Sequence, residues 1–114
     1  MRADLGPTFA ALADPTRRAI LARLARGEAT VGELHAPLSI SMPAVSRHLK
    51  VLEQAGLVER RVEAQFRPVR LRPEGLLEVR AWVDDLREIW EQRLDRLESY
   101  LAELQAAEVS DDHD

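Results

Sequence analysis

Serine, arginine and lysine side chains gather near the start of the segment SMPAVSRHLKVLEQAGLV, residues 41–58. At about 100° per residue, one arc of the predicted helix carries Pro43, Ser46, Arg47, Lys50, Glu53 and Gln54. Arginine can pair bidentately with guanine, serine can bond several base edges, and lysine suits a phosphate. The first turns hold no acidic residue, and the positive end of the helix dipole lies there. The arc predicts DNA contact through Ser46, Arg47 and Lys50, with an ordinary solvated helix face as the alternative.

The opposite arc of this helix is suited to burial. It spans about 160° and contains Ala44, Val45, His48, Leu49, Val51, Leu52 and Ala55. Ser41 is the predicted N-cap, and Gly56 supplies the left-handed residue after the helix end. His48 has two interpretations, which are hydrogen-bonded packing within this arc and contact with a base or phosphate. Both Ser41 and His48 are counted among the candidate DNA-binding residues.

A shorter helix precedes this one in the sequence. Thr30 is its predicted N-cap, Val31 and Leu34 face inward, and Pro37 ends it. Two short helices joined by a turn of about four residues form a helix-turn-helix. We therefore expect the segment from Thr30 to Gly56 to have this arrangement.

Two apolar runs after the helix-turn-helix predict a β-hairpin. They are LVERRV at residues 57–62 and FRPVRL at residues 66–71, and Pro68 must take an edge or unpaired position. Helix-turn-helix followed by a hairpin is the winged-helix arrangement. The hairpin also contains Arg60, Arg61, Arg67, Arg70 and Arg72. Gln65 and Arg67 lie nearest the turn and are candidates for DNA backbone or minor-groove contact. Solubilising edge charges are the alternative role.

Two helical patterns open the chain. Leu5, Phe9 and Leu12 recur at helical spacing around Gly6-Pro7, and Asp14-Pro15 then supplies an N-cap and a first helical residue. The second pattern has the buried stripe Ile20, Leu21 and Leu24 and ends at Gly27. We expect two short helices before the helix-turn-helix.

A long helical pattern begins at Glu74. Its apolar stripe consists of Leu76, Val79, Val83, Leu86, Trp90, Leu94, Leu97, Leu101 and Leu104, and Trp82, Ile89 and Tyr100 widen it. A helix of about 30 residues is about 45 Å long, whereas a domain of this size has a radius of gyration of about 13 Å. Part of the stripe therefore has nothing of its own chain to cover it. We expect a homodimer with an interface that contains Leu5, Phe9, Leu12, Val83, Leu86, Trp90, Leu94, Leu97 and Leu101.

The distribution of charge is more informative than the total. The 114 residues fit one domain, with a DNA-binding and dimerisation part at 1–104 and a frayed acidic tail at 105–114. The net charge of −4 argues against a nucleic-acid partner. It divides, however, into +1 over residues 1–40, +4 over 41–73 and −9 over 74–114. The basic middle third favours a DNA partner, with a chance fluctuation as the alternative.

The residue types exclude several classes of protein. There is no cysteine, so disulfides and thiolate metal sites are excluded, and the scattered histidines His35, His48 and His113 predict neither metal nor cofactor. Nothing in the sequence pairs a nucleophile with a base or forms a glycine-rich phosphate loop, so we expect no enzyme. The start MRADLGPTFA lacks the apolar region of a signal peptide, and no run of about 18 apolar residues exists. We therefore expect a cytoplasmic protein that does not enter a membrane.

Two segments resemble the ArsR family of bacterial winged-helix repressors. They are LADPTRRAIL at residues 12–21 and SMPAVSRHLKVLEQAGLVERR at residues 41–61, and the likeness covers roughly residues 5–104. The resemblance implies a homodimeric repressor that binds a pseudo-palindromic operator in double-stranded DNA. It places Met42, Pro43, Ser46 and Arg47 at base-reading positions and residues 63–67 at the wing tip.

The sequence also departs from the family pattern. Many members sense metals or arsenicals through cysteines of the third helix, where this chain has TVGELHAPL, and redox sensors need a cysteine pair. Others use Asp and His on the last helix, where this chain has Asp84 and Asp85 but no histidine. The chain thus resembles members without the usual inducer site, and its inducer is unknown. AWVDDLREIWEQRLDRLESYL resembles members often encoded beside polyketide-cyclase-like (SRPBCC) proteins. Ala64 replaces a glycine common at the wing turn.

Together these patterns predict a mainly α-helical winged helix-turn-helix with a small β-hairpin. The predicted function is that of a dimeric, sequence-specific transcriptional repressor. The alternative from another class is a protein-interaction module on a winged-helix scaffold that has lost DNA binding, which the basic middle third disfavours.

Overall fold

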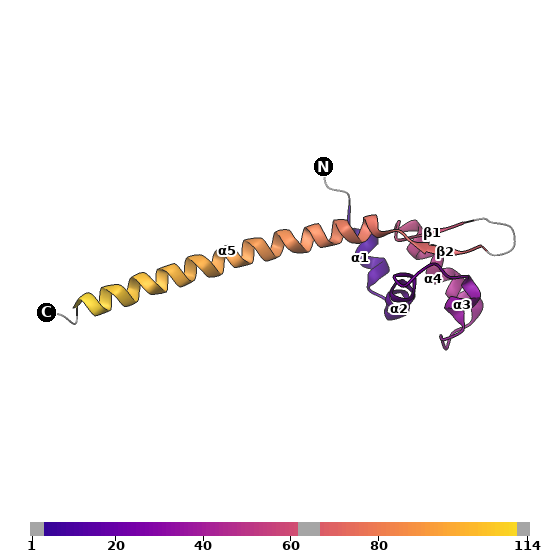
Figure 1. Ribbon diagram of the computed structural model, residues 1–114, viewed down its shortest axis with the longest axis horizontal. Helices are drawn as coiled ribbons and strands as arrows, with labels where there is room; N and C mark the ends of the chain where they lie inside the picture. The colour runs from indigo at the N-terminus through magenta and orange to yellow at the C-terminus, as the bar shows by residue number, and fades with distance from the viewer. Residues whose placement is uncertain (1–3, 62–66, 112–114) are drawn as a thin grey trace. The chain divides into compact units, whose positions relative to one another are not determined.

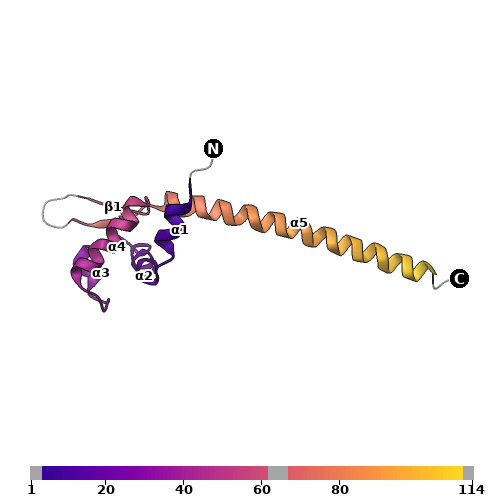
Figure 2. The ribbon, with the colours of Figure 1, turned by 180° about the vertical axis from the view of Figure 1, so that it is seen from behind.

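The computed structural model describes residues 4–61 and 67–111 (Figure 1). Its elements within these ranges are α1 Gly6–Leu12, α2 Pro15–Leu24, α3 Val31–His35, α4 Met42–Gln54, β1 Val58–Arg60, β2 Val69–Leu71 and α5 Pro73–Asp111. The residues up to Val79 form one unit, and those from Arg80 onward form another. Within the first unit, Figures 1 and 2 show α2, α3 and α4 together beside the hairpin. The predicted winged helix-turn-helix fold is confirmed.

Short-range hydrogen bonds explain where α2, α3 and α4 begin. The side chain of Asp14 accepts from the backbone N–H of Arg17 at 3.0 Å, and Ser41 Oγ accepts from Ala44 N–H at 3.3 Å. Thr30 forms a capping box, because its Oγ1 accepts from Glu33 N–H and Glu33 Oε1 accepts from Thr30 N–H, both at 3.2 Å. The three predicted N-caps are therefore confirmed.

The ends of the helices follow the expected residues closely. Gly56 has a φ of 75° directly after the C-cap of α4, which is a left-handed conformation that glycine adopts without strain. Gly27 has a φ of 144° and follows the end of α2 by three residues. The helix α3 ends just before Pro37, and residues 36–41 then connect it to α4, a turn slightly longer than expected.

The wing is a two-stranded antiparallel hairpin that a third segment extends. Val58 pairs with Leu71 and Arg60 with Val69. The strands are shorter than the predicted runs, and residues 62–66 lie outside the described ranges. Pro68, which has no N–H to donate, lies just before β2. Its carbonyl accepts from Arg61 N–H at 2.9 Å. Ala29 forms an additional bridge with Val69, through N–H to O distances of 3.1 and 2.7 Å.

One apolar core holds the helix-turn-helix and the wing together. It consists of Ala11, Ile20, Leu21, Leu24, Ala29, Leu34, Val45, Leu49, Leu52, Leu57, Val58 and Val69. The buried side of α4 is narrower than predicted, because Val51 is 37% exposed. At about 100° per residue, Val51 lies about 120° around the helix from the fully buried Val45, at the edge of the predicted arc.

The first helix turns small residues toward the core. Thr8 and Ala11 are its buried residues, whereas Phe9 is 39% exposed. Leu12 is half-buried and packs against the core. Part of the predicted apolar stripe of this helix therefore remains on the surface.

The last helix is longer than the sequence pattern suggested. It comprises 39 residues, about 58 Å at 1.5 Å per residue. Residues 105–111 of the expected frayed tail are helical, because QAAE continues with good helix formers and no glycine or proline. Residues 112–114 lie outside the described ranges. Its residues up to Val79 belong to the first unit, where Leu76 packs against the core. In the part of the chain that the structure describes, no helix is both long and apolar enough to span a membrane.

Candidate DNA-binding surface

The first turns of α4 present a mixed polar and cationic surface. Met42 is 41% exposed, Pro43, Arg47 and Lys50 are also exposed, and Ser46 is half-buried. On the other side of the helix, Val45, Leu49 and Leu52 are anchored in the core. The sequence prediction of one buried and one solvent-facing side is therefore confirmed for these residues. The predicted base-reading residues lie on the accessible side of a firmly held helix.

The cations of α4 differ from its anion in how they are paired. Within residues 4–61 and 67–111, Arg47 and Lys50 have no ion-pair partner. Glu53, by contrast, lies 3.2 Å from Nε of Arg60, and Nη2 of the same arginine donates to the carbonyl oxygen of Ser46 at 3.4 Å. Arg60 thus neutralises the only acidic side chain of α4 and links the helix to the wing. This leaves the first turns of α4 with an uncompensated positive charge.

Three further wing arginines, Arg67, Arg70 and Arg72, differ in whether they pair with a carboxylate. Nη2 of Arg70 lies 2.6 Å from Glu59 Oε1, and Nε of Arg72 lies 4.0 Å from Glu59 Oε2 and 3.9 Å from Glu74 Oε2. These two arginines are therefore compensated within the chain. Arg67 is exposed, has a φ of 35°, and has no ion-pair partner among the described residues. Gln65, the other predicted wing contact, lies outside the described ranges.

His48 is half-buried and faces α2. Its Nδ1 lies 3.3 Å from Nη1 of Arg17. A guanidinium can only donate, so Nδ1 accepts this hydrogen bond and the ring proton of the neutral form is on Nε2. The geometry agrees with the packing interpretation of His48, and contact with DNA through Nε2 stays a prediction.

Two adjacent arginines of α2 bind the end of α1, which the sequence analysis did not predict. Arg17 donates from Nε to the carbonyl oxygen of Ala11 at 2.7 Å and from Nη2 to that of Ala10 at 3.0 Å. Arg18 Nη1 donates to the carbonyl oxygens of Leu12 and Ala13, at 2.9 and 3.1 Å. The last carbonyls of a helix lack partners within it, so these bonds satisfy them. The sequence feature that could have indicated this contact is the pair of arginines in the first turn of a helix that begins with Asp-Pro.

The turn between α1 and α2 also perturbs a carboxyl group. The backbone N–H of Arg17 donates to Asp14, which lowers the pKa of the Asp14 carboxyl below its ordinary value. Desolvation acts in the opposite direction, and the backbone N–H of Thr16 and the positive charge of Arg17 add to the lowering. Asp14 is therefore held as an anion at the start of α2, where the helix dipole favours it.

Among the residues that the structure describes, no group of three or more His, Asp or Glu side chains is placed to hold a metal ion. His35 lies beside the turn of the helix-turn-helix, with Nε2 at 2.8 Å from the carbonyl oxygen of Ile40. Asp84 lies 3.7 Å from Nε of Arg80 and 3.6 Å from Nη2 of Arg87. These side chains have structural partners within the chain.

Comparisons with known proteins identify the same DNA-binding element. A family model described as a helix-turn-helix domain matches residues 12–61. The chain is 50% identical over 84 residues to the HTH-type transcriptional regulator Rv2034 of Mycobacterium tuberculosis, covering 74% of this chain and 76% of that protein. It is 41% identical over 58 residues to the transcriptional repressor SdpR of Bacillus subtilis, covering 51% of this chain and 64% of that protein.

This chain is also similar to a solved structure over most of the length of both chains. It is the crystal structure of an ArsR family transcriptional regulator, with a TM-score of 0.72 and 40% sequence identity, over 76% of this chain and 96% of that chain. The matched helix-turn-helix model contains all of α2, α3, α4 and β1, which carry the exposed cations of α4 and the arginine that links α4 to the wing. This chain belongs to the ArsR family of winged helix-turn-helix transcriptional regulators, which bind DNA and are not enzymes.

Proposed function

We propose that this chain is a homodimeric repressor that binds a pseudo-palindromic operator through α4 and the wing. The observation that supports the proposal most directly is the pairing of charges on this surface. Arg47, Lys50 and Arg67 have no carboxylate partner within the described chain, whereas Arg60 and Arg70 have one. A phosphate backbone is the polyanion that such a surface attracts.

The residues of α4 have distinct proposed roles. Arg47 reads a base edge, with guanine as the preferred partner because a guanidinium bonds its O6 and N7 together. Lys50 contacts a phosphate. Ser41, Met42, Pro43 and Ser46 line the groove with Arg47, and His48 holds α4 against Arg17 of α2. In the wing, Arg67 and Gln65 contact the backbone or the minor groove.

The proposed dimer interface is the apolar stripe of α5. Trp90, Leu94, Leu97, Leu101 and Leu104 follow one another at steps of four and three residues, the spacing of a coiled-coil seam. They are exposed: Trp90 by 60% and Leu97 by 52%. Exposed apolar stripes of this length mark association surfaces, and a second copy offers the same stripe in return. Leu5, Phe9, Leu12, Val83 and Leu86 extend the proposed interface.

Two copies would place their α4 helices in successive major grooves, about 34–36 Å apart. The acidic last third, with a net charge of −9, then belongs to the dimer interface and not to the DNA surface. Without cysteines, release from the operator uses no thiolate metal or redox site. Such a regulator acts in the cytoplasm, and gene neighbours of the SRPBCC class stay a prediction from the pattern of residues 81–101.

Fluorescence anisotropy with DNA from upstream of the protein's own gene tests DNA binding, and selection of bound genomic fragments supplies the site if it lies elsewhere. We expect Arg47→Ala to weaken specific binding by about 1–3 kcal/mol. Arg96→Ala is the control for loss of one arginine charge, because Arg96 is an exposed arginine of α5 and lies outside α4 and the wing. Unchanged affinity for Arg47→Ala would remove Arg47 from the readout.

The same titration separates this proposal from the protein-interaction alternative. If Lys50 and Arg67 of both copies each neutralise one phosphate, the logarithm of the affinity falls with the logarithm of salt concentration at a slope of about −3.6. An interaction module that has lost DNA binding gives no salt-dependent binding to any selected fragment.

Sedimentation equilibrium tests the dimer. We expect Leu97→Asp to produce monomers, because each copy would bury a carboxylate in the apolar interface. Ser99→Asp introduces the same side chain on the opposite side of α5, two positions from Leu97, and should leave the dimer intact. A wild-type protein that is monomeric at micromolar concentration would contradict the proposed interface.

A further inference from the structure

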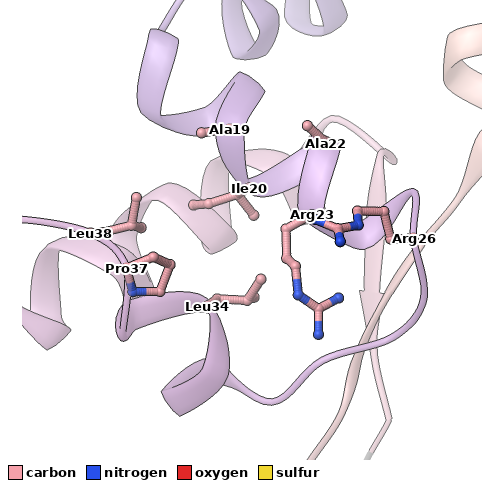
Figure 3. A pocket seen from close by; sticks show the side chains of 8 residues that line it. All are labelled: Ala19, Ile20, Ala22, Arg23, Arg26, Leu34, Pro37 and Leu38. Carbon is pink, nitrogen blue, oxygen red and sulfur yellow. The ribbon is translucent and has the colours of Figure 1, made fainter.

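An apolar pocket lies between α2 and α3. None of the residues that line it belongs to α4. Its volume is about 490 Å³, within the range of small-molecule sites. Figure 3 shows Ile20 of α2 and Leu34 of α3 pointing toward each other across it, with Pro37 and Leu38 at one side. Alanine methyl groups of α2 complete the apolar wall. The pocket thus resembles a site for an apolar group more than a site for a metal or a sugar.

Two arginines at the other side give the pocket a positive rim. Arg23 donates from Nη1 to the carbonyl oxygen of Gly27 at 3.1 Å, and its Nη2 lies 3.6 Å from Glu33 Oε2. Arg26 lines the same pocket, is exposed, and has no ion-pair partner within residues 4–61 and 67–111. The rim therefore carries two cations, of which Arg23 is paired with the neighbouring Glu33 and Arg26 is uncompensated among the described residues.

We infer that this pocket binds a small carboxylate with an apolar tail, such as a medium-chain fatty acid. The tail would lie against Ile20, Leu34 and Leu38, where it loses contact with water. The carboxylate would pair with Arg26, whose planar guanidinium can donate two parallel hydrogen bonds to it. Glu33 repels the same carboxylate and competes for Arg23. A neutral ligand would form no ion pair with Arg26, and a ligand without an apolar tail would not cover the apolar wall.

The pocket walls also belong to the core that positions α4. Ile20 and Leu34 are each only 2% exposed, and both α2 and α3 pack against α4. A ligand in the pocket contacts these two nearly buried side chains, which form the inner wall of the pocket. A shift of either side chain changes the packing behind the recognition helix, because a close-packed core transmits such displacements. Ligand binding and DNA binding therefore oppose each other, a step that rests on the proposed function.

Isothermal titration calorimetry of the full chain without DNA tests the pocket itself. Octanoate is the probe, and 1-octanol is its neutral partner of equal chain length. We expect octanoate to bind once per chain and 1-octanol to bind at least about tenfold more weakly. Arg26→Gln should weaken octanoate binding about tenfold, and Glu33→Gln, which keeps the capping box, should strengthen it. Arg96→Gln is the control that removes one exposed arginine elsewhere.

Three results would overturn the assignment of the pocket. They are the absence of octanoate binding at millimolar concentration, equal affinity for octanoate and 1-octanol, and an affinity that Arg26→Gln leaves unchanged. Circular dichroism of each variant checks that the fold is retained.

Anisotropy with DNA tests the coupling separately. Saturating octanoate should lower the affinity of the wild-type protein for its site several-fold and should have less effect on Arg26→Gln. Octanoate that binds in calorimetry but leaves DNA affinity unchanged overturns the coupling. Failure of the protein to bind any DNA overturns the proposed function, and the calorimetric result for the pocket stands independently of it.

Discussion

Replacing Arg17 by alanine removes one guanidinium that joins three helices. Arg17 is a residue of α2, and its guanidinium donates to the carbonyl oxygens of Ala11 and Ala10 in α1 at 2.7 and 3.0 Å. Its Nη1 lies 3.3 Å from Nδ1 of His48 in α4. The carbonyls of Ala10 and Ala11 belong to the last turn of α1, where a helix leaves carbonyls without their usual partners. The Ala10 carbonyl also accepts from the backbone N–H of Ala13 at 3.3 Å. Arg17→Ala leaves these acceptors and the His48 ring without their charged donor.

The size of the effect follows from the burial of each bond. A hydrogen bond from a charged donor contributes about 1.5–3 kcal/mol when it is shielded from water. The bonds to Ala11 and His48 are partly buried, whereas the bond to Ala10 is exposed and adds little. We therefore expect Arg17→Ala to lower the free energy of unfolding by about 2–3 kcal/mol. Arg18→Ala, which removes only exposed bonds, should cost about 0.5–1 kcal/mol.

Urea unfolding followed by circular dichroism measures both variants, at one protein concentration because the proposed dimer would gain stability with concentration. His48→Ala combined with each arginine variant isolates the contact between α2 and α4. We expect coupling with Arg17 and none with Arg18. Equal losses for Arg17→Ala and Arg18→Ala would refute the role of Arg17 as the junction of three helices.

Two further substitutions test local features of the fold. Gly75→Ala places a Cβ only 2.9 Å from Cδ2 of the fully buried Leu57, so it should destabilise the chain by about 1 kcal/mol. In Gly32→Ala the new Cβ meets nothing closer than 3.9 Å, so this substitution should stabilise α3 by up to about 1 kcal/mol. The midpoints of urea unfolding compare the two variants. Asp14→Asn tests the lowered pKa of Asp14. A lowered folded-state pKa gives stability that is present above the unfolded pKa, about 4, and lost as pH falls through the folded pKa, so the advantage of the wild type over Asp14→Asn should shrink as the pH is lowered below about 4 in urea unfolding. A constant difference across that range would contradict the stabilised carboxylate.

The features that the sequence predicted well depend on residues close together in the chain. The N-caps Asp14, Thr30 and Ser41 each accept from a backbone N–H three residues later, so a short pattern contains both partners. The left-handed Gly56 follows from the same local geometry. The core positions of α4 follow from helical periodicity, and only Val51, at the edge of the arc, was assigned to the wrong side.

The features that the sequence did not predict join distant segments. Arg17 and His48 are 31 residues apart. The bridge between Ala29 and Val69 depends on how the wing folds back, which no periodicity of either segment indicates. The pocket between α2 and α3 depends on how these two helices lie relative to each other. Such contacts require the tertiary arrangement, because several partners of suitable chemistry exist for each residue.

Charge pairing shows why a count of arginines does not locate a DNA-binding surface. Residues 41–73 carry a net charge of +4, and the sequence alone leaves every wing arginine as a candidate. In the structure Glu53 neutralises Arg60, and Glu59 lies beside both Arg70 and Arg72.

The same carboxylates that pair with these arginines also link the wing to α4 and β1 to β2. The basic side chains without such partners in the described ranges of this segment include Arg47 and Lys50 on α4 and Arg67 beside the wing tip. These cations would lose no internal ion pair on meeting a phosphate, so their attraction to DNA is not offset by a broken contact. The acidic residues of the segment therefore select which cations remain available, and a chain with a net charge of −4 retains a locally positive surface for a polyanion.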